Sequence, residues 1–453
     1  PYSFIPPIDG EEYLIITADQ WEDESALSTF IEHKTSLGYN VTLTALHNIG
    51  NNPDSDDIRD YIKSLYDKCQ TMYVLLVGNV SDISTTNMPF YSGTQDYMLN
   101  PPSDLYYSCL SKNNVSNQWM DLNPSVFLGR WPVTSSAQLE NIVKKTIKSD
   151  MCLGIYTPDK IALFSGDGNC WEGKQMYNDC KYIYNNLIQP ASSSYSGDLI
   201  DGRDPLIPDA FTYMKNFLED TSVHPTWLFV YDGHGSSSCI SSPYHMCNID
   251  IGSVTTSALD FQPFGFGFAC RLGNIYENYN FARAWITDDD GGVSFLGATT
   301  KTTFASDKYF SRKLFIQMKN KPVMTIGEFI GNGKAKYYNP DKVVWRMNEA
   351  KKYVLYGDPS LFLSGLDFDY RTPLMVKKHT QHLESEDVNV IIENNILRIA
   401  TDNVESVYIY SITGQLLLAQ NANMINLQSL PAGMYSVVID INHNHITKKF
   451  IKQ

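Results

Sequence analysis

The sequence predicts an α/β fold, in which a parallel sheet is covered by helices and followed by a small β-sandwich. In the first part of the chain, short apolar runs alternate with segments of helical periodicity. This alternation is typical of parallel sheets with crossover helices. From about residue 388 the helical patterns stop, and short strand patterns separated by turns continue to residue 453. Such a run of strands is typical of an immunoglobulin-like sandwich.

The chain is expected to have four parts. Residues 1–150 and 151–365 both carry the alternating pattern, and we interpret them as two α/β subdomains of one sheet-containing domain. Residues 366–386 are charged, contain Pro373 and give few structural signals, so they are a predicted linker. Residues 387–453 form the sandwich. The length of 453 residues agrees with this division, because about 150 residues is a typical domain size.

Buried strands and intervening helices make up both subdomains. The first helix ends at Gly38, and the helix at 56–69 carries acidic residues in its first turn, which suits its dipole. Residues 91–123 are polar, aromatic and irregular, and are predicted to form a surface loop. Strands are expected at 12–17, 41–46, 72–77, 160–164, 227–231 and 264–269, helices at 25–37, 56–69, 135–150, 171–187, 208–220 and 278–287, and sandwich strands at 388–392, 396–400, 404–410, 415–419, 424–427, 433–439 and 447–451.

The composition excludes several classes of partner. The net charge is -15 and the pI is near 5.0, which argues against nucleic acid and anionic membrane surfaces. No apolar run approaches the length of about 18 residues that a transmembrane helix requires. The chain begins at Pro1 without the charged and apolar segments of a signal peptide. We therefore expect either a cytosolic protein or one whose leader has been removed, and the C-terminal features below favour removal.

Two strand ends carry residues with nucleophilic or basic chemistry. The strand at 227–231 leads into Asp232-Gly233-His234-Gly235, and the strand at 264–269 leads into Cys270. If the two strands are neighbours, their carboxyl ends bring His234 and Cys270 to the same edge of the sheet. A nearby imidazole makes a thiol a strong nucleophile. The alternative is that Cys270 is an inert core residue, and the spacing alone leaves both interpretations open.

Several motifs together resemble one family. Tyr231–Ser236 and Phe268–Cys270 resemble the His and Cys motifs of the gingipain family of cysteine peptidases, which have a caspase-like fold. Three further stretches fit the same family in the same order, and the resemblance spans residues 10–365. These stretches are 126–133, 291–299 and 354–361.

The resemblance implies a cysteine endopeptidase that hydrolyses peptide bonds through a Cys-His dyad and a thioester acyl-enzyme. The backbone N–H groups of Gly235 and Cys270 would then form the oxyanion hole. Asp167 lies in a third polar turn after a strand, and by resemblance it orients the His234 imidazole. The alternative for Asp167 is an ordinary turn residue.

The preferred substrate is less defined by the sequence. The arginine- and lysine-specific gingipains use acidic residues in the pocket for the residue before the cleaved bond, so a basic residue is expected there. Trp285, Phe304 and the stretch from Thr299 to Thr302 are candidate pocket residues. Glu172 and Asp179 are candidates for the acidic group, and the sequence does not decide between them.

The resemblance implies that no cofactor is required, although structural calcium is known in the family. Asp288-Asp289-Asp290-Gly291 resembles the start of a calcium loop but lacks the later Glu, so a turn is expected there. The eight cysteines are too few for a disulfide scaffold. Cys239 with Cys247, and Cys170 with Cys180, are candidate pairs. A zinc site at Cys239, His245 and Cys247 fits no closed four-ligand spacing.

The C-terminal strands contain motifs of their own. Val407–Gln415, Leu430–Tyr435 and Lys448–Lys452 resemble the C-terminal sorting domain of type IX secretion cargo in Bacteroidetes. The alternative is a generic immunoglobulin-like module. The resemblance implies contact with the type IX machinery, export across the outer membrane, and a secreted or surface-attached protein.

Two rival functions remain on the same fold. One is a transpeptidase similar to the sortase that processes such cargo, and that enzyme would not need a sorting domain of its own. The other is a catalytically silent surface-binding protein, against which intact Cys270 and His234 argue. The expected partners of the endopeptidase are protein or peptide substrates.

Overall fold

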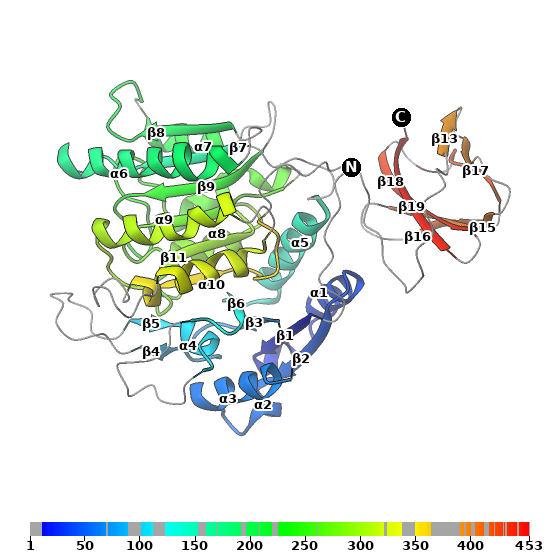
Figure 1. Cartoon of the computed structure of the whole chain (residues 1–453), viewed down its shortest axis with the longest axis horizontal. Coiled ribbons are helices and arrows are strands. Elements are labelled where there is room, and N and C mark those ends of the chain that lie inside the picture. The colour runs from blue at the N-terminus through cyan, green and yellow to red at the C-terminus, as the bar shows by residue number, and fades with distance from the viewer. Residues whose placement is uncertain are drawn as a thin grey trace. The chain divides into compact units, whose positions relative to one another are not determined.

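The computed structural model divides the chain into two compact units, one of residues 7–152 with 158–367 and one built mainly from residues 368–453 (Figure 1). The predicted linker at 366–386 lies outside the described residues. The structure describes residues 11–68, 71–88, 101–111, 123–152, 160–168, 170–191, 196–207, 209–219, 225–259, 261–320, 324–337, 349–363, 390–393, 396–399, 404–411, 416–420, 422–428, 430, 433–441 and 444–452.

A single ten-stranded sheet runs through the larger unit (Figure 1). Neighbouring strands are parallel except for β12 and β11, which pair antiparallel. The sheet therefore has two halves that run in opposite directions, which the sequence patterns did not predict. The order is β2 (Asn40–Ala45), β1 (Glu12–Thr17), β3 (Met72–Val77), β6 (Phe127–Trp131), β12 (Tyr353–Tyr356), β11 (Ser294–Ala298), β10 (Phe264–Phe268), β9 (Thr226–Asp232), β7 (Lys160–Ser165) and β8 (Ser196–Asp201).

Helices cover both faces of this sheet, which explains why the central strands are apolar on both sides. In β1, Tyr13 and Ile15 pack into one core cluster, and Leu14 and Ile16 pack into another. Helices α1 (Ser25–Ser36), α5 (Ser136–Cys152), α7 (Ala210–Glu219) and α8 (Phe281–Thr287) cover the first face. Helices α3 (Ser55–Tyr66), α4 (Leu105–Ser108), α6 (Cys170–Ile183), α9 (Phe304–Asn320) and α10 (Ile326–Tyr337) cover the second, and α2 (Leu46–Ile49), β4 (Thr86–Asn87) and β5 (Pro102–Ser103) are short additions.

The predicted α/β fold is confirmed in the larger unit, whereas the boundary near residue 150 between two subdomains stays a prediction.

Local sequence explains where α3 begins. Asp54 and Asp57 form a capping box at the start of α3, in which each side chain accepts a backbone N–H of the other residue.

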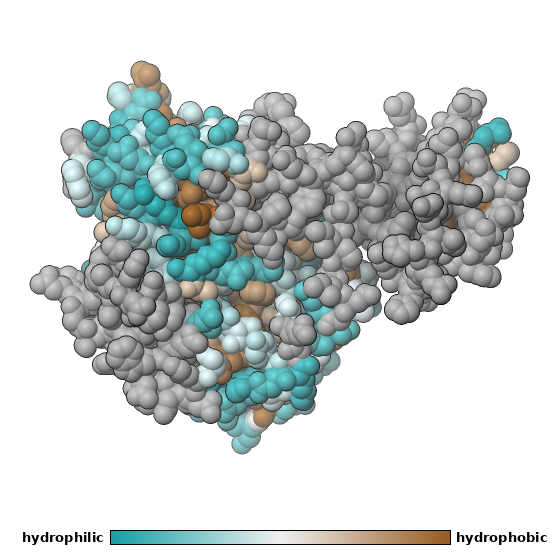
Figure 2. Space-filling model, in the orientation of Figure 1, coloured by the Kyte–Doolittle hydropathy of each residue, from teal (hydrophilic) through white to brown (hydrophobic). Residues whose placement is uncertain are grey.

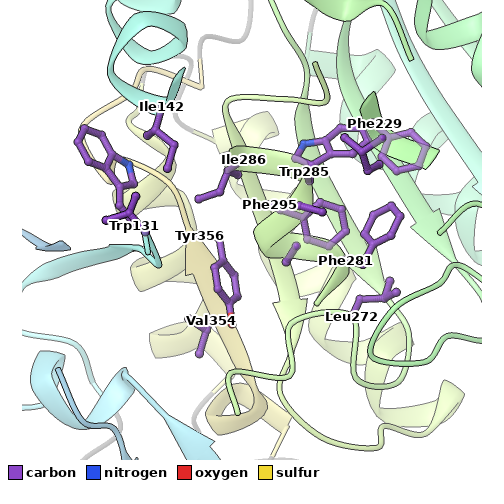
Figure 3. Packing of buried hydrophobic residues seen from close by; sticks show 14 of the residues in the cluster. Trp131, Ile142, Phe229, Leu272, Phe281, Trp285, Ile286, Phe295, Val354 and Tyr356 are labelled. Atoms are coloured by element: carbon purple, nitrogen blue, oxygen red, sulfur yellow. The ribbon is translucent and has the colours of Figure 1, made fainter. Parts of the chain in front are cut away.

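The core beneath β9, β10 and β11 is built around Trp285 of α8 (Figure 3). Its ring stacks on Phe229 with centroids 5.3 Å apart, and Phe281 and Phe295 pack against it. Gly292 must lack a side chain here, because a Cβ atom would lie 2.1 Å from Trp285 Nε1. Burial of aromatic surface on this scale is a dominant stabilising contribution.

Two buried ion pairs hold the half of the sheet that contains β1. The Arg130 guanidinium binds both carboxylate oxygens of Asp104, at 2.7 and 2.8 Å, and also donates to the carbonyls of Gly78 and Ile83. Residues 101–110 are buried. The prediction of a surface loop at 91–123 is therefore wrong for the stretch around Asp104, while residues 89–100 and 112–122 lie outside the described residues.

The second buried ion pair joins three elements. Lys34 Nζ lies 2.6 Å from Asp150 Oδ2 and 2.7 Å from Asp358 Oδ2, and its side chain is fully buried. Although burial alone lowers it, the two carboxylates hold the pKa of Lys34 above its usual value. Asp358 belongs to the stretch 354–361, so this stretch fixes the end of β12 against α1 and α5.

The C-terminal unit has two antiparallel sheets and a small core of its own, as predicted for a β-sandwich. Its core gathers side chains from both sheets, including Leu397, Ile409, Ile425 and Val437. One sheet contains β13 (Val390–Glu393), β14 (Ile396–Ile399) and β17 (Met424–Asn426), and the other contains β16 (Leu416–Gln420), β15 (Val404–Ser411), β18 (Gly433–Ile441) and β19 (Asn444–Lys452).

The described surface of the larger unit is mainly hydrophilic in the view of Figure 2. Large apolar side chains that reach solvent are scattered, and Leu206, Ile249 and Trp171 are the most exposed among those described. Within the described part of the chain, no helix combines the length and the apolarity needed to cross a bilayer.

Candidate active site

Three strands end at the same edge of the sheet. β9 and β10 are parallel neighbours, with Phe268 opposite Asp232, which confirms that the His and Cys strands lie side by side. β7 flanks β9 on its other side, with Ser165 opposite Asp232. His234 and Cys270 each follow that register position by two residues. The two side chains therefore start from matching places on adjacent strands, as expected.

The backbones of the two strand ends are in contact. A Cβ atom at Gly235 would lie 2.9 Å from the carbonyl oxygen of Cys270, so only glycine allows this approach. On the other side of the histidine, a Cβ at Gly233 would lie 2.3 Å from the hydroxyl of Tyr231. That hydroxyl donates to the His234 carbonyl at 2.8 Å. The two glycines thus fit His234 between Tyr231 and the Cys270 loop.

The backbone N–H groups of Gly235 and Cys270 differ from their neighbours in hydrogen bonding. Neighbouring groups are paired, since Ser236 N–H donates to the Cys239 carbonyl and Arg271 N–H donates to the Thr300 carbonyl. Among the described residues, neither the Gly235 N–H nor the Cys270 N–H donates a hydrogen bond. Unpaired backbone donors are uncommon in folded proteins and are often found at functional sites.

The Cys270 thiol faces the loop between β11 and α9. Thr302 N–H donates to the sulfur at 3.3 Å, and the Thr302 carbonyl accepts from the thiol at 3.5 Å. The next residue, Arg271, has a φ angle of 62°. A side chain other than glycine is uncommon in that left-handed region, and such strain clusters at functional sites.

The His234 imidazole lies beside a carboxylate. Its Nε2 atom is 3.8 Å from Glu172 Oε2, and the two side chains are 52% and 35% exposed. Glu172 lies in the first turn of α6, the helix that follows the Asp167 turn. The sequence singled it out only as a substrate-binding candidate. Its position near the amino end of that helix is the signal that could have identified it as a partner of His234.

Asp167 lies at the same edge but contacts a different group. Its carboxylate accepts a hydrogen bond from Ser242 Oγ at 2.6 Å. The preceding residue, Ser241, donates its N–H to the His234 carbonyl at 3.0 Å. Asp167 therefore contacts the loop that pairs with the His234 backbone, and the direct orienting role expected of it stays a prediction.

Two predicted pocket residues are not at the surface. Trp285 is fully buried in the aromatic core of Figure 3, so the prediction that it contacts substrate is wrong. Thr299 is also buried, and its hydroxyl donates to the Pro102 carbonyl at 2.8 Å, so its predicted pocket role is wrong too. The sequence near these motifs gave no signal of whether a side chain faces the core or the surface. Of the predicted stretch from Thr299 to Thr302, it is Thr302 that contacts the thiol.

Two further acids near this edge are buried. Asp179 of α6 accepts from Arg312 Nε at 2.6 Å and from Ser311 Oγ at 3.2 Å, so it does not face a substrate. Asp232 is the last residue of β9, and burial, together with the nearby Asp179 and Asp307 carboxyls, raises its pKa well above the usual value. Of the two acids that the sequence offered for substrate binding, Glu172 is the one with solvent exposure.

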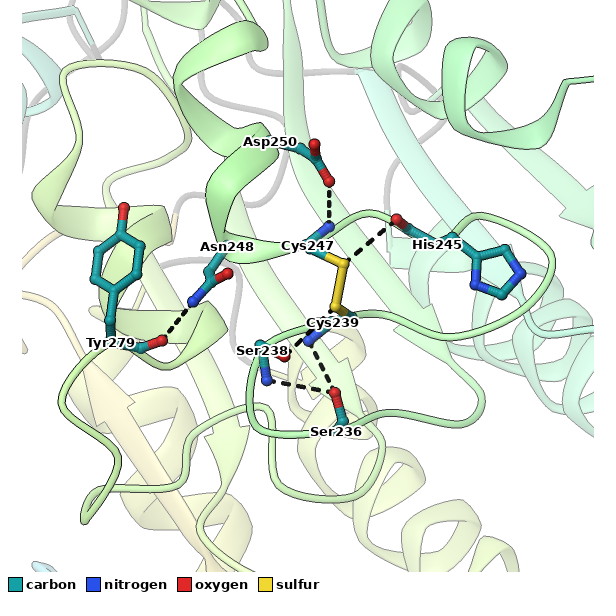
Figure 4. The surroundings of a disulfide bond; sticks show 8 residues. All are labelled: Ser236, Ser238, Cys239, His245, Cys247, Asn248, Asp250 and Tyr279. Carbon is teal, nitrogen blue, oxygen red and sulfur yellow. Dashed lines mark hydrogen bonds between the residues drawn. A yellow bond between two sulfur atoms is a disulfide. The ribbon is translucent and has the colours of Figure 1, made fainter.

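A disulfide closes the loop after His234 (Figure 4). It joins Cys239 and Cys247, as one of the predicted pairings requires. Because both sulfur atoms are bonded to each other, this site does not bind zinc, and the His245 ring points away from it in Figure 4. Cys180 is a free, buried thiol, so the predicted pairing of Cys180 with Cys170 is wrong.

The acidic run at 288–290 surrounds a lysine. Lys145 Nζ donates to the carbonyls of Asp288 and Asp290, and burial lowers the pKa of this amine to about 7. The Lys145 amine thus binds the backbone of the run that resembles a calcium loop. Across the described ranges, no group of three or more His, Cys, Asp or Glu side chains could hold a metal ion. A structural calcium elsewhere stays a prediction.

Comparison with known proteins agrees with this geometry. Residues 8–364 match the model of peptidase family C25. The chain belongs to peptidase family C25. This is the gingipain family of cysteine peptidases, so the family suggested by the motifs is confirmed. Residues 387–453 match the secretion system C-terminal sorting domain, which identifies the protein as type IX secretion cargo, exported to the cell surface or beyond.

Solved structures of this family share the fold. The crystal structure of the Arg-specific cysteine proteinase gingipain R (RGPB) is 18% identical, with 99% of each chain covered and a TM-score of 0.64. The complex of the Porphyromonas gingivalis RgpB pro- and mature domains is also 18% identical, covers 97% of this chain and 99% of that chain, and has a TM-score of 0.62. None of the curated protein sequences matches this chain.

Proposed function

We propose that this family C25 peptidase is an exported endopeptidase in which Cys270 is the nucleophile and His234 the general acid and base. One observation carries the proposal. The register of β9 and β10 puts His234 and Cys270 at matching positions just beyond two adjacent strand ends. The flanking Gly235 lets these strand ends approach closely.

In the proposed reaction, His234 takes the proton of the Cys270 thiol, and the thiolate attacks the scissile carbonyl carbon to form a tetrahedral oxyanion. His234 then gives this proton to the leaving amine as the C–N bond breaks. The product is a thioester between Cys270 and the acyl half of the substrate. Water, deprotonated by His234, then attacks the thioester and releases the acid and the thiol.

The N–H groups of Gly235 and Cys270 are proposed to bind the oxyanion. They have no acceptor in the described part of the chain, and their strand ends are in contact. Donors that are fixed before the reaction stabilise the developing charge without having to reorganise. This availability supports the assignment that the resemblance suggested.

Glu172 and Asp167 are proposed to hold the histidine in two different ways. Glu172 Oε2 lies 3.8 Å from His234 Nε2 and can fix the orientation of the ring. Asp167 holds Ser242, next to the residue that pairs with the His234 carbonyl. In this proposal Glu172 takes the ring-orienting role that the resemblance gave to Asp167, and Asp167 supports the backbone of His234 through Ser242.

The proposed substrates are proteins or peptides with a basic residue before the cleaved bond. One observation supports this preference, because a solved structure with the same fold is described as Arg specific. The reaction as written needs no cofactor, and a calcium ion, if bound, would be structural.

A panel of fluorogenic peptides that differ in the residue before the cleaved bond tests this function. Cys270→Ala is expected to lower kcat/KM by about 10³-fold or more, and His234→Ala by about 10²–10⁴-fold. His245→Ala is the matched control, because it changes a histidine of the neighbouring loop whose ring points away from the disulfide and should leave kcat/KM unchanged. Full activity of Cys270→Ala would refute the assignment.

The same panel, run with an added amine, separates the rival functions. Hydrolysis supports the endopeptidase, transfer of the acyl group to the amine supports the transpeptidase, and no reaction with any peptide supports a silent binding protein. The highest rate after Arg or Lys is expected for the proposed preference.

A further inference from the structure

A chain of hydrogen bonds leads from the Cys270 sulfur into the protein. Thr302 N–H donates to the sulfur at 3.3 Å, and the Thr302 hydroxyl donates to Asp307 Oδ2 at 2.6 Å. The other oxygen of that carboxyl, Asp307 Oδ1, accepts from the Tyr353 hydroxyl at 2.7 Å. Asp307 therefore links the loop that touches the thiol to strand β12, at the centre of the sheet.

Asp307 is held from several sides. It lies in the first turn of α9 and is 3% exposed, and its N–H donates to the Thr303 carbonyl. The ionisable groups that face it are Tyr353 of β12, Glu349 and Lys352 just before β12, and Asp232 at the end of β9. Lys352 Nζ lies 3.1 Å from Glu349 Oε2, and its positive charge offsets part of the negative charge of these buried carboxyls. A carboxyl with this many partners has little freedom to move.

The direction of the Thr302 hydroxyl is thereby fixed. A hydroxyl has one proton, and the Thr302 proton is given to Asp307, so the hydroxyl has none to give to the sulfur. The sulfur, 3.9 Å from that oxygen, instead accepts the backbone N–H. The Thr302 carbonyl, 3.5 Å from the sulfur, accepts only from the protonated thiol, whereas the N–H can bind the thiolate, so a firmly held N–H stabilises the charged form.

We propose that Asp307 is a positioning residue that, through the Thr302 hydroxyl, holds the Thr302 N–H against Cys270 and so favours the reactive thiolate. The inference rests on the proposed function, since it assigns a supporting role in the same peptidase site. A residue that only stabilised the start of α9 would not affect Cys270. Loss of the Asp307 contact is instead expected to change the reactivity of a sulfur that Asp307 does not touch.

Alkylation of Cys270 by iodoacetamide tests the proposal without any need for peptidase activity. The rate at Cys270 is followed from pH 5 to 9 by mass spectrometry of its peptide, because the thiolate is the species that reacts. Thr302→Val removes the hydroxyl and keeps the shape. Asp307 accepts the Thr302 and Tyr353 hydroxyls with its two carboxylate oxygens, and Asp307→Asn leaves only one acceptor oxygen for both. Thr302→Ser keeps the hydroxyl.

Thr302→Val and Asp307→Asn are each expected to move the alkylation profile to higher pH by about one unit, so that the rate at pH 7 falls about tenfold. Thr302→Ser is expected to behave as the unchanged protein. The control variants are Asp209→Asn and Thr212→Val at the start of α7, where a threonine hydroxyl donates to an aspartate in the same way at 2.7 Å. They should leave the profile unchanged.

An unshifted profile in folded Thr302→Val protein overturns the proposal, even if Asp307→Asn fails to fold. An equal shift in the α7 controls also overturns it, since the effect would then be general. If the unchanged protein cleaves no peptide but the shift appears, the positioning role stands and the proposed function fails.

Discussion

The two halves of the central sheet are built alike and end differently. In the half from β2 to β12, buried side chains bind one another where the strands end, as in the Arg130–Asp104 pair. In the half from β11 to β8, the ends of β9 and β10 carry an exposed imidazole, a thiol and two backbone donors that find no acceptor among the described residues. The strands of the two halves run in opposite directions, because β12 and β11 pair antiparallel.

This difference separates stability from chemistry. Buried ions must be paired and hydrogen-bonded, so a half whose polar groups are satisfied internally cannot offer them to a substrate. A catalytic edge needs the opposite arrangement, in which a few groups keep unused hydrogen-bonding capacity. Substitutions in the first half should therefore change stability, and substitutions at the β9–β10 edge should change rate.

The largest expected effect on stability comes from Asp104→Ala. It leaves the fully buried Arg130 guanidinium without its carboxylate, which should lower the free energy of unfolding by about 3–5 kcal/mol. Denaturant unfolding measures the loss, and kcat/KM per folded molecule should not change. The double variant Asp104→Leu with Arg130→Met is the control, and it should recover much of the loss because no charge stays buried. A rate loss in folded Asp104→Ala protein would break the contrast between the two halves.

Gly235→Ala is expected to lower the rate of catalysis while leaving stability almost unchanged. The new Cβ would meet the Cys270 carbonyl at 2.9 Å and displace a proposed oxyanion donor. We expect a fall in kcat of about 10²-fold with a small change in melting temperature. Gly252→Ala is the matched control, because its Cβ would have no neighbour closer than 3.4 Å. Equal activities of the two variants would count against the proposed oxyanion hole.

The smallest expected effects on kcat distinguish Glu172 from Asp167 at the β9–β10 edge. Glu172→Gln should lower kcat about tenfold, because it removes the charge 3.8 Å from His234 Nε2. Asp167→Asn should cost less than about threefold, because an amide oxygen can still accept the bond from Ser242. Steady-state kinetics with one good peptide measures both variants. The reverse order would return the direct orienting role to Asp167.

Much of the fold was predictable because apolar runs of strand length have few other uses in a soluble domain. The predicted strands at 12–17 and 72–77 agree with β1 and β3. The strands β8 and β12 and the helices α9 and α10 were not predicted. In β12 only four residues, Tyr353–Tyr356, form the strand, and nothing in so short a segment tells its direction or its neighbours.

The candidate site was predictable in part for a related reason. His234 and Cys270 follow directly after apolar strands, so sequence neighbours reveal their place. Glu172 and Asp307 act from the first turns of α6 and α9 on residues far away in the chain. Trp285 was misplaced, because a motif cannot tell whether an aromatic ring faces the core or the solvent.

By itself, the sequence determined the α/β alternation, the sandwich with its sorting motifs, and the two strand ends that carry the thiol and the imidazole. These are local properties, since periodicity and flanking glycines act over a few residues. Only the tertiary structure decided that the two halves of the sheet are antiparallel, that Glu172 lies by the imidazole and that Thr302 faces the sulfur. Those contacts join distant segments, and their geometry depends on packing that no single segment encodes.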